Sequence, residues 1–187
     1  FDDKRIFDLC KAIKKADLKG ATFALGQGVR ADKASKKLLK RMFEVGFKYA
    51  TIAVEGGNNK TLRALRKGET IERIEQTIKE ACDIGYEVRL LFVIGARGET
   101  WEDVKDSLMV AEKYPVMYSR FNNLLPIPGT ELYDWVVEEK LALKTPERFL
   151  NDYAMDYTEP FYETPEFTAE ERRRAIIESD KVNQRLF

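Results

Sequence analysis

The sequence predicts an α/β protein built on a parallel sheet of about four βα units, followed by a C-terminal helix. Short apolar runs alternate along the chain with helical patterns, the order expected for parallel strands joined by right-handed helical crossovers. Three of the runs end in a glycine-containing turn, at residues 54–58, 93–100 and 124–130, and each turn opens the next helical pattern. Four strands are too few to close a barrel of eight, so the sheet is open or incomplete.

The predicted strands are short apolar runs bounded by glycine, proline or polar residues. They lie at 21–25, 49–54, 87–94 and 117–125. The first strand is expected to end at Gly26-Gln27-Gly28. The third strand is almost continuously apolar, which is typical of a parallel strand with helices on both of its faces. A helical pattern precedes the first strand and indicates one more strand upstream.

The predicted helices are segments whose apolar residues recur at three- and four-residue spacing. They lie at 4–16, 35–45, 60–66, 71–84, 100–114, 132–139 and 168–187. Capping residues and helix breakers mark their ends. Asp3 can cap the first helix, Gly46 can end the second, and Pro115 stops the fifth. Thr168 and Glu171 form a capping box before the last helix.

The charge of the chain is balanced overall but unevenly distributed. Residues 1–67 carry 17 Lys and Arg against 7 Asp and Glu, a net charge of +10, and residues 68–187 carry a net charge of −10. A basic region can bind phosphates, nucleic acid or an anionic cofactor. It can equally be a set of solvated helix faces, such as Lys36-Lys37 with Lys40-Arg41. No run approaches the ~20 apolar residues of a membrane span, so we expect a cytoplasmic protein without a membrane partner.

Two parts are expected along the chain. Residues 1–145 contain the βα units, and residues 146–187 form a C-terminal extension with the final helix. Within the extension, 153–167 is rich in aromatic and acidic residues. Aromatic platforms that bind nucleic acid come with basic residues, so we expect this segment to pack along the outside or the rim of the sheet. Because Phe1 opens directly into a helical pattern without a methionine, we expect a segment of a longer protein.

The residue types available for chemistry are restricted. The chain has no histidine and two cysteines, Cys10 and Cys82, both within predicted helices. Two distant cysteines form neither a metal cluster nor a disulfide framework, which favours buried thiols in a reducing cytoplasm and no metal ligands in this chain. Proton transfer near neutral pH would require a carboxylate, Lys, Tyr or Cys with a shifted pKa.

Candidate binding residues lie at the ends of the first two strands. Glu55 follows an apolar run, and Gly56-Gly57 would let a ligand approach the backbone closely. Alternatively, this segment is a helix start capped by Asn58 or Asn59. Lys67, at the end of the next helix, can serve the helix C-terminus or reach a ligand carboxylate. Arg30 can bind an anion or pair with Asp32 at the surface.

The two later turns match no phosphate-binding fingerprint. Residues 95–100 lack both the G-K-[ST] ending and the G-x-G-x-x-G spacing, which excludes a P-loop or a Rossmann site. Their amides could instead hold a planar group by backbone hydrogen bonds. The segment 126–130 contains two prolines and a glycine, so it either forms a rigid loop that places the next helix or contacts a ligand directly.

Taken together, these motifs resemble the later part of a radical SAM (S-adenosylmethionine) domain of the kind found behind cobalamin-binding domains. The similar stretches, in matching order and spacing over about residues 1–140, are 28–33, 38–42 with Gly46, 54–58, 67–70, 92–100 and 126–133. The resemblance implies a TIM-like partial (βα)6 barrel of which this chain holds the third to sixth strands. It also implies SAM contacts on the rim, with the ribose, amino or carboxylate groups near Glu55 and Lys67 and the adenine near 93–95. The implied cofactor-binding residues are Arg30, Glu55, Gly56, Gly57, Lys67, Val93, Ile94 and Gly95.

One departure from the family decides the chemistry of the isolated chain. The C-x-x-x-C-x-x-C loop that holds the [4Fe–4S] cluster in the family is absent, and without three thiolates there is no cluster and no one-electron cleavage of SAM. The resemblance therefore implies an enzyme, of oxidoreductase or methyltransferase type, only together with an upstream part of the same polypeptide. Cobalamin is a possible further cofactor, and the substrate is unknown. The alternatives are a basic-faced module that binds RNA or another partner without catalysis, and a degenerate barrel with a structural role.

Overall fold

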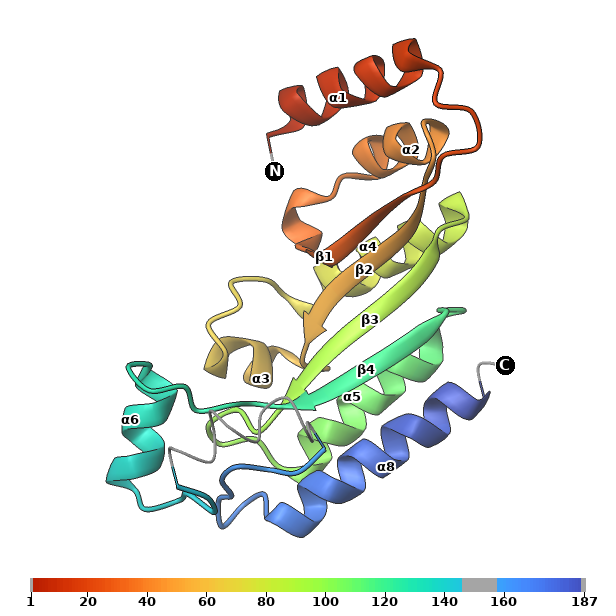
Figure 1. The fold of residues 1–187 in the computed structure, drawn as a ribbon. Helices are drawn as coiled ribbons and strands as arrows, with labels where there is room; N and C mark the ends of the chain where they lie inside the picture. The colour runs from red at the N-terminus through yellow and green to blue at the C-terminus, as the bar shows by residue number, and fades with distance from the viewer. Residues whose placement is uncertain (1, 146–157, 186–187) are drawn as a thin grey trace.

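The computed structural model describes residues 2–145 and 158–185, and they form a parallel sheet flanked by helices (Figure 1). The strands are β1 (Phe23–Val29), β2 (Phe47–Glu55), β3 (Glu87–Ile94) and β4 (Tyr118–Asn123), in the spatial order β1-β2-β3-β4. Each strand pairs in parallel with the next strand along the chain. The predicted α/β class and the parallel sheet are confirmed, and all carboxyl ends of the strands lie at one rim.

Helices connect the strands along the chain (Figure 1). In chain order they are α1 (Asp3–Ala16), the 3-10 turn η1 (Ala31–Lys33), α2 (Lys36–Glu44), α3 (Asn59–Ala64), α4 (Ile71–Ile84), α5 (Trp101–Lys113), α6 (Glu131–Glu138) and α8 (Ala169–Arg185). Helix α4 packs on β2 and β3, α5 on β3, and α8 on both β4 and α5. Helix α1 packs on α2.

The start of the chain differs from the sequence prediction in two places. Asp2, not Asp3, caps α1, because its side chain accepts from the Arg5 amide. Strand β1 does not end at Gly26 but continues through the glycines to Val29, with an irregular register between Leu25 and Val29. Because β1 is one of the two outer strands of the described sheet, β2 is its one neighbour there, and the glycines lie in a bulged edge instead of a terminating turn.

The core lies between the strands and the helices behind them. In β3, Val88, Leu90, Phe92 and Ile94 are fully buried, while the residues between them are only partly buried. Phe92 stacks on Phe121 of β4 with ring centroids 4.4 Å apart. The prediction of helices on both faces of β3 is therefore wrong for the described residues: the apolar run faces the helix layer with one side and a more open face with the other.

The C-terminal segment 158–185 joins the same core. Phe167, Ile176 and Val182 belong to the buried cluster that contains the strands. At the edge of β4, the Asn183 side-chain amide accepts from the Ser119 N–H and donates to the Ser119 carbonyl, both at 2.8 Å, in the manner of a neighbouring strand. Of the aromatic segment expected along the outside or the rim, Tyr162 reaches the rim, where its hydroxyl donates to the Gly95 carbonyl, whereas 153–157 lies outside the described residues. The division at residue 145 stays a prediction.

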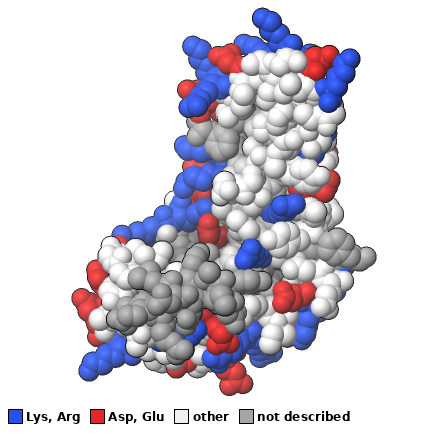
Figure 2. All heavy atoms as spheres, viewed as in Figure 1, with Lys and Arg blue, Asp and Glu red and all other residues white. Residues whose placement is uncertain are grey.

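Basic side chains gather at the end of the molecule that carries α1 and α2, at the top of Figure 2. Some of them pair with acidic neighbours, such as Lys11 with Asp8 at 3.0 Å and Arg41 with Glu44 at 3.1 Å. Binding of nucleic acid to this end stays an alternative that the structure does not test. In the described part of the chain, every helix is too short or too polar to span a bilayer.

Candidate functional site

Glu55 and Lys67 meet at the rim of β2. Glu55 is the last residue of the strand and has a left-handed backbone, with φ of 68°. Lys67 Nζ lies 3.4 Å from Glu55 Oε1 and 3.5 Å from Glu69 Oε2. The Glu69 side chain is fully buried, whereas 27% of the Glu55 side chain is exposed. One ammonium group is thus held between a buried carboxylate and a partly exposed one.

Arg30 lies on the same rim but already has partners. Its guanidinium binds both carboxylate oxygens of Asp32 at 3.1 Å and donates to the Lys67 carbonyl at 3.1 Å. This pairing lowers the pKa of Asp32. The Asp32 amide in turn donates to Glu69 Oε1 at 2.8 Å. Of the two interpretations of Arg30, the structure shows the ion pair, and Glu69 connects it to the Glu55–Lys67 pair.

The glycines after Glu55 are required for packing. An added Cβ at Gly56 would meet Thr61 Cγ2 at 2.6 Å, and one at Gly57 would overlap the backbone of α5 at Asp106 and Ser107. The Gly57 amide also donates to Ser107 Oγ at 2.8 Å. The two glycines therefore allow α3 and α5 to pack closely on this turn. The cofactor-binding role of Gly56 and Gly57 stays a prediction.

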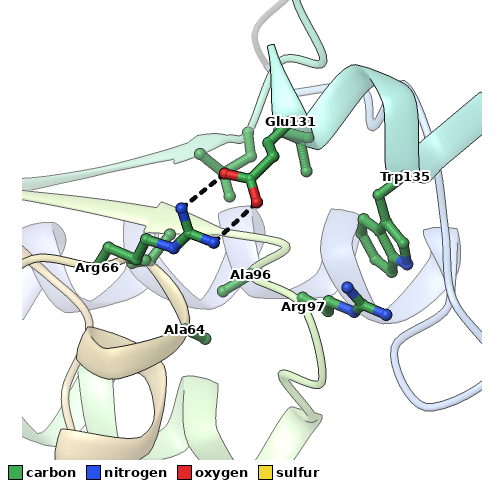
Figure 3. Close-up of a pocket in the computed structure, with 9 residues that line it drawn as sticks. Ala64, Arg66, Ala96, Arg97, Glu131 and Trp135 are labelled. Carbon is green, nitrogen blue, oxygen red and sulfur yellow. Dashed lines mark hydrogen bonds and ion pairs between the residues drawn. The ribbon is translucent and has the colours of Figure 1, made fainter.

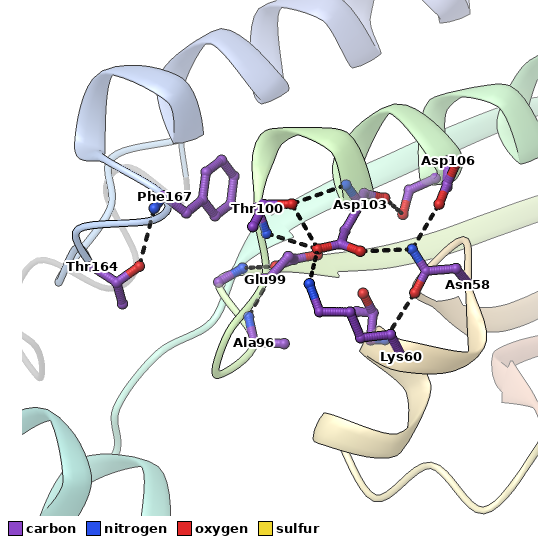
Figure 4. Close-up of polar contacts among 12 residues, drawn as sticks. Asn58, Lys60, Ala96, Glu99, Thr100, Asp103, Asp106, Thr164 and Phe167 are labelled. Carbon is purple, nitrogen blue, oxygen red and sulfur yellow. Dashed lines mark hydrogen bonds and ion pairs between the residues drawn. The ribbon is translucent and has the colours of Figure 1, made fainter.

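A cluster of polar side chains joins the start of α3 to α5 and is part of Figure 4. Asn58 caps the helix by accepting from the Thr61 amide at 2.9 Å, as one of the alternatives predicted. The Asn58 amide group donates to Asp103 and Asp106 of α5, and Lys60 Nζ lies 2.6 Å from Asp103. Burial acts to raise the pKa of Asp103, but hydrogen bonds from Lys60, Thr100 and Asn58 lower it overall. These contacts hold α3 firmly on α5, so Glu55 projects from a fixed turn.

The turn after β3 is organised around a buried glutamate. Glu99 is 2% exposed, and one of its oxygens accepts from the Gly95 amide at 2.5 Å and the Ala96 amide at 2.9 Å (Figure 4). Burial raises the pKa of Glu99 to about 7, although these two N–H donors and the charge of Arg172 act in the opposite direction. The amides that could have held a planar ligand thus bind this side chain instead.

Among residues 93–95, the side chains differ in accessibility. Ile94 is fully buried under the helices, and Gly95 is buried as well. Val93 is only partly buried and lies on the opposite face of β3. Glu55 pairs in register with Phe92, so Glu55 and Val93 lie at neighbouring positions of the same rim. Val93 is therefore the residue of the three whose side chain is accessible on the open face.

A cavity of about 310 Å³ opens between α3 and α6, beside the residues that follow β3 and β4. Figure 3 shows Arg66 and Glu131 facing each other across it, joined by two hydrogen bonds of 2.7 and 2.8 Å. Arg97 lies against the Trp135 ring, with 5.3 Å from Cζ to the ring centroid. Thr130 caps α6 by accepting from the Tyr133 amide, so the proline-containing loop leads directly into this helix. Whether the loop is a rigid connection or contacts a ligand directly stays a prediction.

The residues present do not suit an iron–sulfur cluster. Cys10 is buried in α1 and Cys82 lies in α4, where burial raises the pKa of its thiol to about 11. No group of three potential metal ligands occurs in residues 2–145 and 158–185. Since a [4Fe–4S] cluster takes three or four thiolates and the whole sequence has two, this chain alone cannot hold it.

Parallel βα units with a polar rim at their carboxyl ends define a TIM-like α/β fold. The family model of the radical SAM superfamily matches residues 2–111, which is more than half of the chain. The chain therefore belongs to the radical SAM superfamily.

Two named relatives resemble this chain over part of their length. It is 27% identical over 140 residues to a protein named as an uncharacterized methyltransferase of Pyrococcus horikoshii, covering 75% of this chain. It is 30% identical over 165 residues to the cytidylyl-2-hydroxyethylphosphonate methyltransferase of Streptomyces wedmorensis, covering 84% of this chain. The chain spans 30% of the length of each relative.

Solved structures share the fold. The radical SAM methyltransferase TsrM of Kitasatospora setae matches with a TM-score of 0.70 and 14% identity over 94% of this chain and 40% of that one. The cobalamin-dependent SAM radical enzyme OxsB matches with a TM-score of 0.50 and 20% identity over 81% of this chain and 20% of that one. At such identities the likeness supports the TIM-like fold and nothing finer.

The rim brings together most of the residues singled out from the sequence. Arg30, Glu55 and Lys67 belong to one polar cluster, and 93–95 lie at the next strand. Sequence reasoning missed Glu69 as a member of this cluster, although it stands two residues after Lys67. It also missed that Tyr162 and Arg172 contact Gly95 in the turn after β3 (the β3 turn), since these residues lie more than 60 positions away.

Proposed function

We propose that the chain supplies the third to sixth strands of a radical SAM barrel and that its rim forms part of the SAM and substrate site. The observation that supports this is the Glu55–Lys67 pair, a carboxylate and an ammonium 3.4 Å apart at the carboxyl end of β2. The amino-acid end of SAM carries one ammonium and one carboxylate, and its ribose carries two hydroxyls. A partly exposed pair of opposite charges complements these groups.

Each residue of the pair has a distinct task in the proposal. The outward Glu55 carboxylate accepts hydrogen bonds from the ribose hydroxyls or the ammonium group. Lys67 binds the ligand carboxylate, and buried Glu69 keeps the Lys67 side chain at the rim. Glu55 also has a left-handed backbone conformation, which raises the free energy of a non-glycine residue by about 1 kcal/mol. Strain kept at a rim position is a common feature of binding sites.

The neighbouring strand would receive the adenine. Val93 offers an apolar side chain on the open face of β3, next to Glu55 in the sheet. Arg30 would take part less directly, because a ligand anion has to compete with Asp32 for its guanidinium. The cavity between α3 and α6, with Arg66 and Glu131 at its mouth and Trp135 in its wall, is the space that we assign to the substrate.

The finer reaction type is also part of this proposal. A [4Fe–4S] cluster supplies the electron that cleaves SAM in this superfamily, and its thiolates would come from another part of the polypeptide, so the isolated chain would be inactive. The methyltransferase names of the relatives favour a methyl-transferring enzyme over an oxidoreductase. The fold shared with OxsB and TsrM makes cobalamin a further candidate cofactor.

SAM titration of the full-length gene product tests the proposal. We expect calorimetric binding of SAM that Glu55→Gln weakens at least about tenfold, equivalent to about 1.4 kcal/mol. Glu112→Gln is the matched control, because Glu112 pairs with Arg185 on the helix layer, away from the rim. Unchanged affinity in Glu55→Gln, or no SAM binding by the wild type, would contradict the proposed function. Formation of 5′-deoxyadenosine on reduction would test the radical chemistry separately.

A further inference from the structure

Gly95 is held by side chains from two distant segments. Its N–H donates to Glu99 within the turn, and its carbonyl accepts from the Tyr162 hydroxyl of the C-terminal segment. Its φ is 107°, and an added Cβ would overlap Arg172 Nη1. Both polar groups and the open side of this residue are therefore occupied, which fixes the peptide groups on either side of it.

Arg172 is a buried charge placed against this turn. Its side chain is fully buried, and its Nε donates to the Phe167 carbonyl at 3.3 Å. The guanidinium lies over the rings of Tyr162 and Phe167, with Cζ at 4.3 and 5.0 Å from the ring centroids. Nη1 and Nη2 find no hydrogen-bond partner among the described residues.

Such a placement is costly for the fold. Burying a guanidinium group without full hydrogen bonding costs several kcal/mol, only partly offset by two aromatic faces and by the nearby Glu99 carboxylate. An apolar side chain would fill the same space more cheaply. A charge retained at this cost and set directly on a turn of the rim indicates a role in the site, because local rules are most often broken at functional positions.

We propose that Tyr162 and Arg172 are positioning residues that fix the Gly95 turn, so that the C-terminal segment 158–185 sets the affinity of the rim for SAM. Neither residue touches the ligand. The Tyr162 hydroxyl donates to the Gly95 carbonyl, and Arg172 Nη1 occupies the space that a Cβ on Gly95 would need. Tyr162 also contacts the Trp135 ring edge-on at 5.9 Å, so it connects the same turn to the wall of the cavity. The inference rests on the proposed function, because SAM is the ligand whose adenine this strand end would receive.

The test compares two tyrosines that each lose one hydroxyl. Tyr162→Phe keeps the ring over Arg172 and removes only the hydrogen bond to Gly95. Tyr114→Phe is the control, because its hydroxyl binds Glu75 at 3.2 Å, away from the rim. For Tyr162→Phe of the full-length gene product we expect SAM affinity to fall about tenfold, which corresponds to the free energy of about one buried hydrogen bond. We also expect the Gly95 and Ala96 amides to exchange with solvent at least about tenfold faster in NMR spectra. The control should change neither quantity.

A second variant keeps the inference testable if the first has a small effect. Arg172→Lys retains the charge but loses the planar stacking on Tyr162 and Phe167, and we expect the same two changes. Unchanged SAM affinity in both variants would overturn the inference, whatever the exchange rates. If the wild type binds no SAM, the proposed function fails by itself. In that case faster exchange at Gly95 in Tyr162→Phe still supports the positioning of the turn, and unchanged exchange overturns it.

Discussion

The turn after β2 and the turn after β3 lie next to each other at the rim, and each contains one glutamate and at least one constrained glycine. Glu55 ends β2 with its side chain partly exposed and paired with Lys67. Glu99 lies inside the next turn, 2% exposed, and binds two backbone amides. The first turn thus presents a charged side chain to solvent, whereas the second uses its charged side chain to shape its own backbone.

The glycines of the two turns differ in the same way. Gly57 is pressed against the backbone of α5, while Gly95 is pressed against the side chain of Arg172. A helix backbone cannot move aside, but a side chain can in part. We infer that the first turn is fixed by the framework and carries function in its side chains. The second is fixed by the C-terminal segment, and in the proposed site it would act through its backbone geometry.

The largest effect is expected at Gly57, because its substitution tests directly whether the packing of α5 fixes the turn after β2 (the β2 turn). Gly57→Ala places a methyl group in the backbone of α5 at Asp106 and Ser107, so either the turn or the helix must shift. We expect the free energy of unfolding to fall by about 3 kcal/mol or more, at the upper end for overpacking. Urea unfolding measures the change.

Gly26→Ala is the matched control for this substitution. Gly26 lies in β1, and an added Cβ there meets nothing within 4 Å. We expect a change within about 0.5 kcal/mol, as for an exposed site. If Gly57→Ala and Gly26→Ala changed the free energy of unfolding equally, α5 would not pack closely on the β2 turn. The distinction between the two turns would then be wrong.

The next effect is a pH dependence specific to Glu99. The folded protein holds the Glu99 proton more tightly than the unfolded chain, since its pKa is raised from 4.5 to about 7. This contribution to stability is complete below pH 4.5 and is lost as the pH rises through about 7. We expect a loss on the order of 3 kcal/mol, at about 1.4 kcal/mol for each pKa unit between the two states.

Glu99→Gln isolates this contribution. Arg172 from α8, Tyr162 from the C-terminal segment and Asp103 from α5 face Glu99 and remain in the variant. The difference between the wild-type and Glu99→Gln unfolding free energies should therefore slope downwards between pH 4.5 and 7 and be flat above. Parallel curves would mean that Glu99 titrates as an exposed glutamate does, and hence that the β3 turn is as open as the β2 turn.

Sequence reasoning was most successful where short-range signals decide the structure. The bounds of β3 were predicted without error, and the parallel rim followed from local pattern. The cap at Asn58 was one of the alternatives that turn chemistry left open. The end of β1 was predicted wrongly at Gly26, because glycine marks a bulged edge strand as readily as a turn. A prediction of this kind depends on knowing which strand is at the edge, and that is a property of the whole sheet.

The parts of the site that escaped prediction depend on contacts distant in sequence. The C-terminal helix pattern around Arg172 has an ordinary amphipathic spacing, and nothing in it signals that one arginine points inwards. Likewise, Glu99 resembles a helix-start carboxylate from its position, yet its oxygen binds the amides of Gly95 and Ala96. Burial decides these roles, and burial of a charged residue is set by tertiary packing.

The smallest expected change in stability is at Glu55, and it separates binding from folding most sharply. Asparagine adopts the left-handed conformation more easily than glutamate, so Glu55→Asn should relieve strain at φ of 68° and raise the free energy of unfolding by about 0.5 kcal/mol. Removing the carboxylate should at the same time weaken SAM binding at least about tenfold. Lys140→Asn, at φ of 57° on an exposed residue after α6, should give the same stabilisation with unchanged SAM affinity. If Glu55→Asn instead lost stability and kept its affinity for SAM, the role of Glu55 would be to stabilise the fold through its ion pair with Lys67. The glutamates of the two turns would then both be structural.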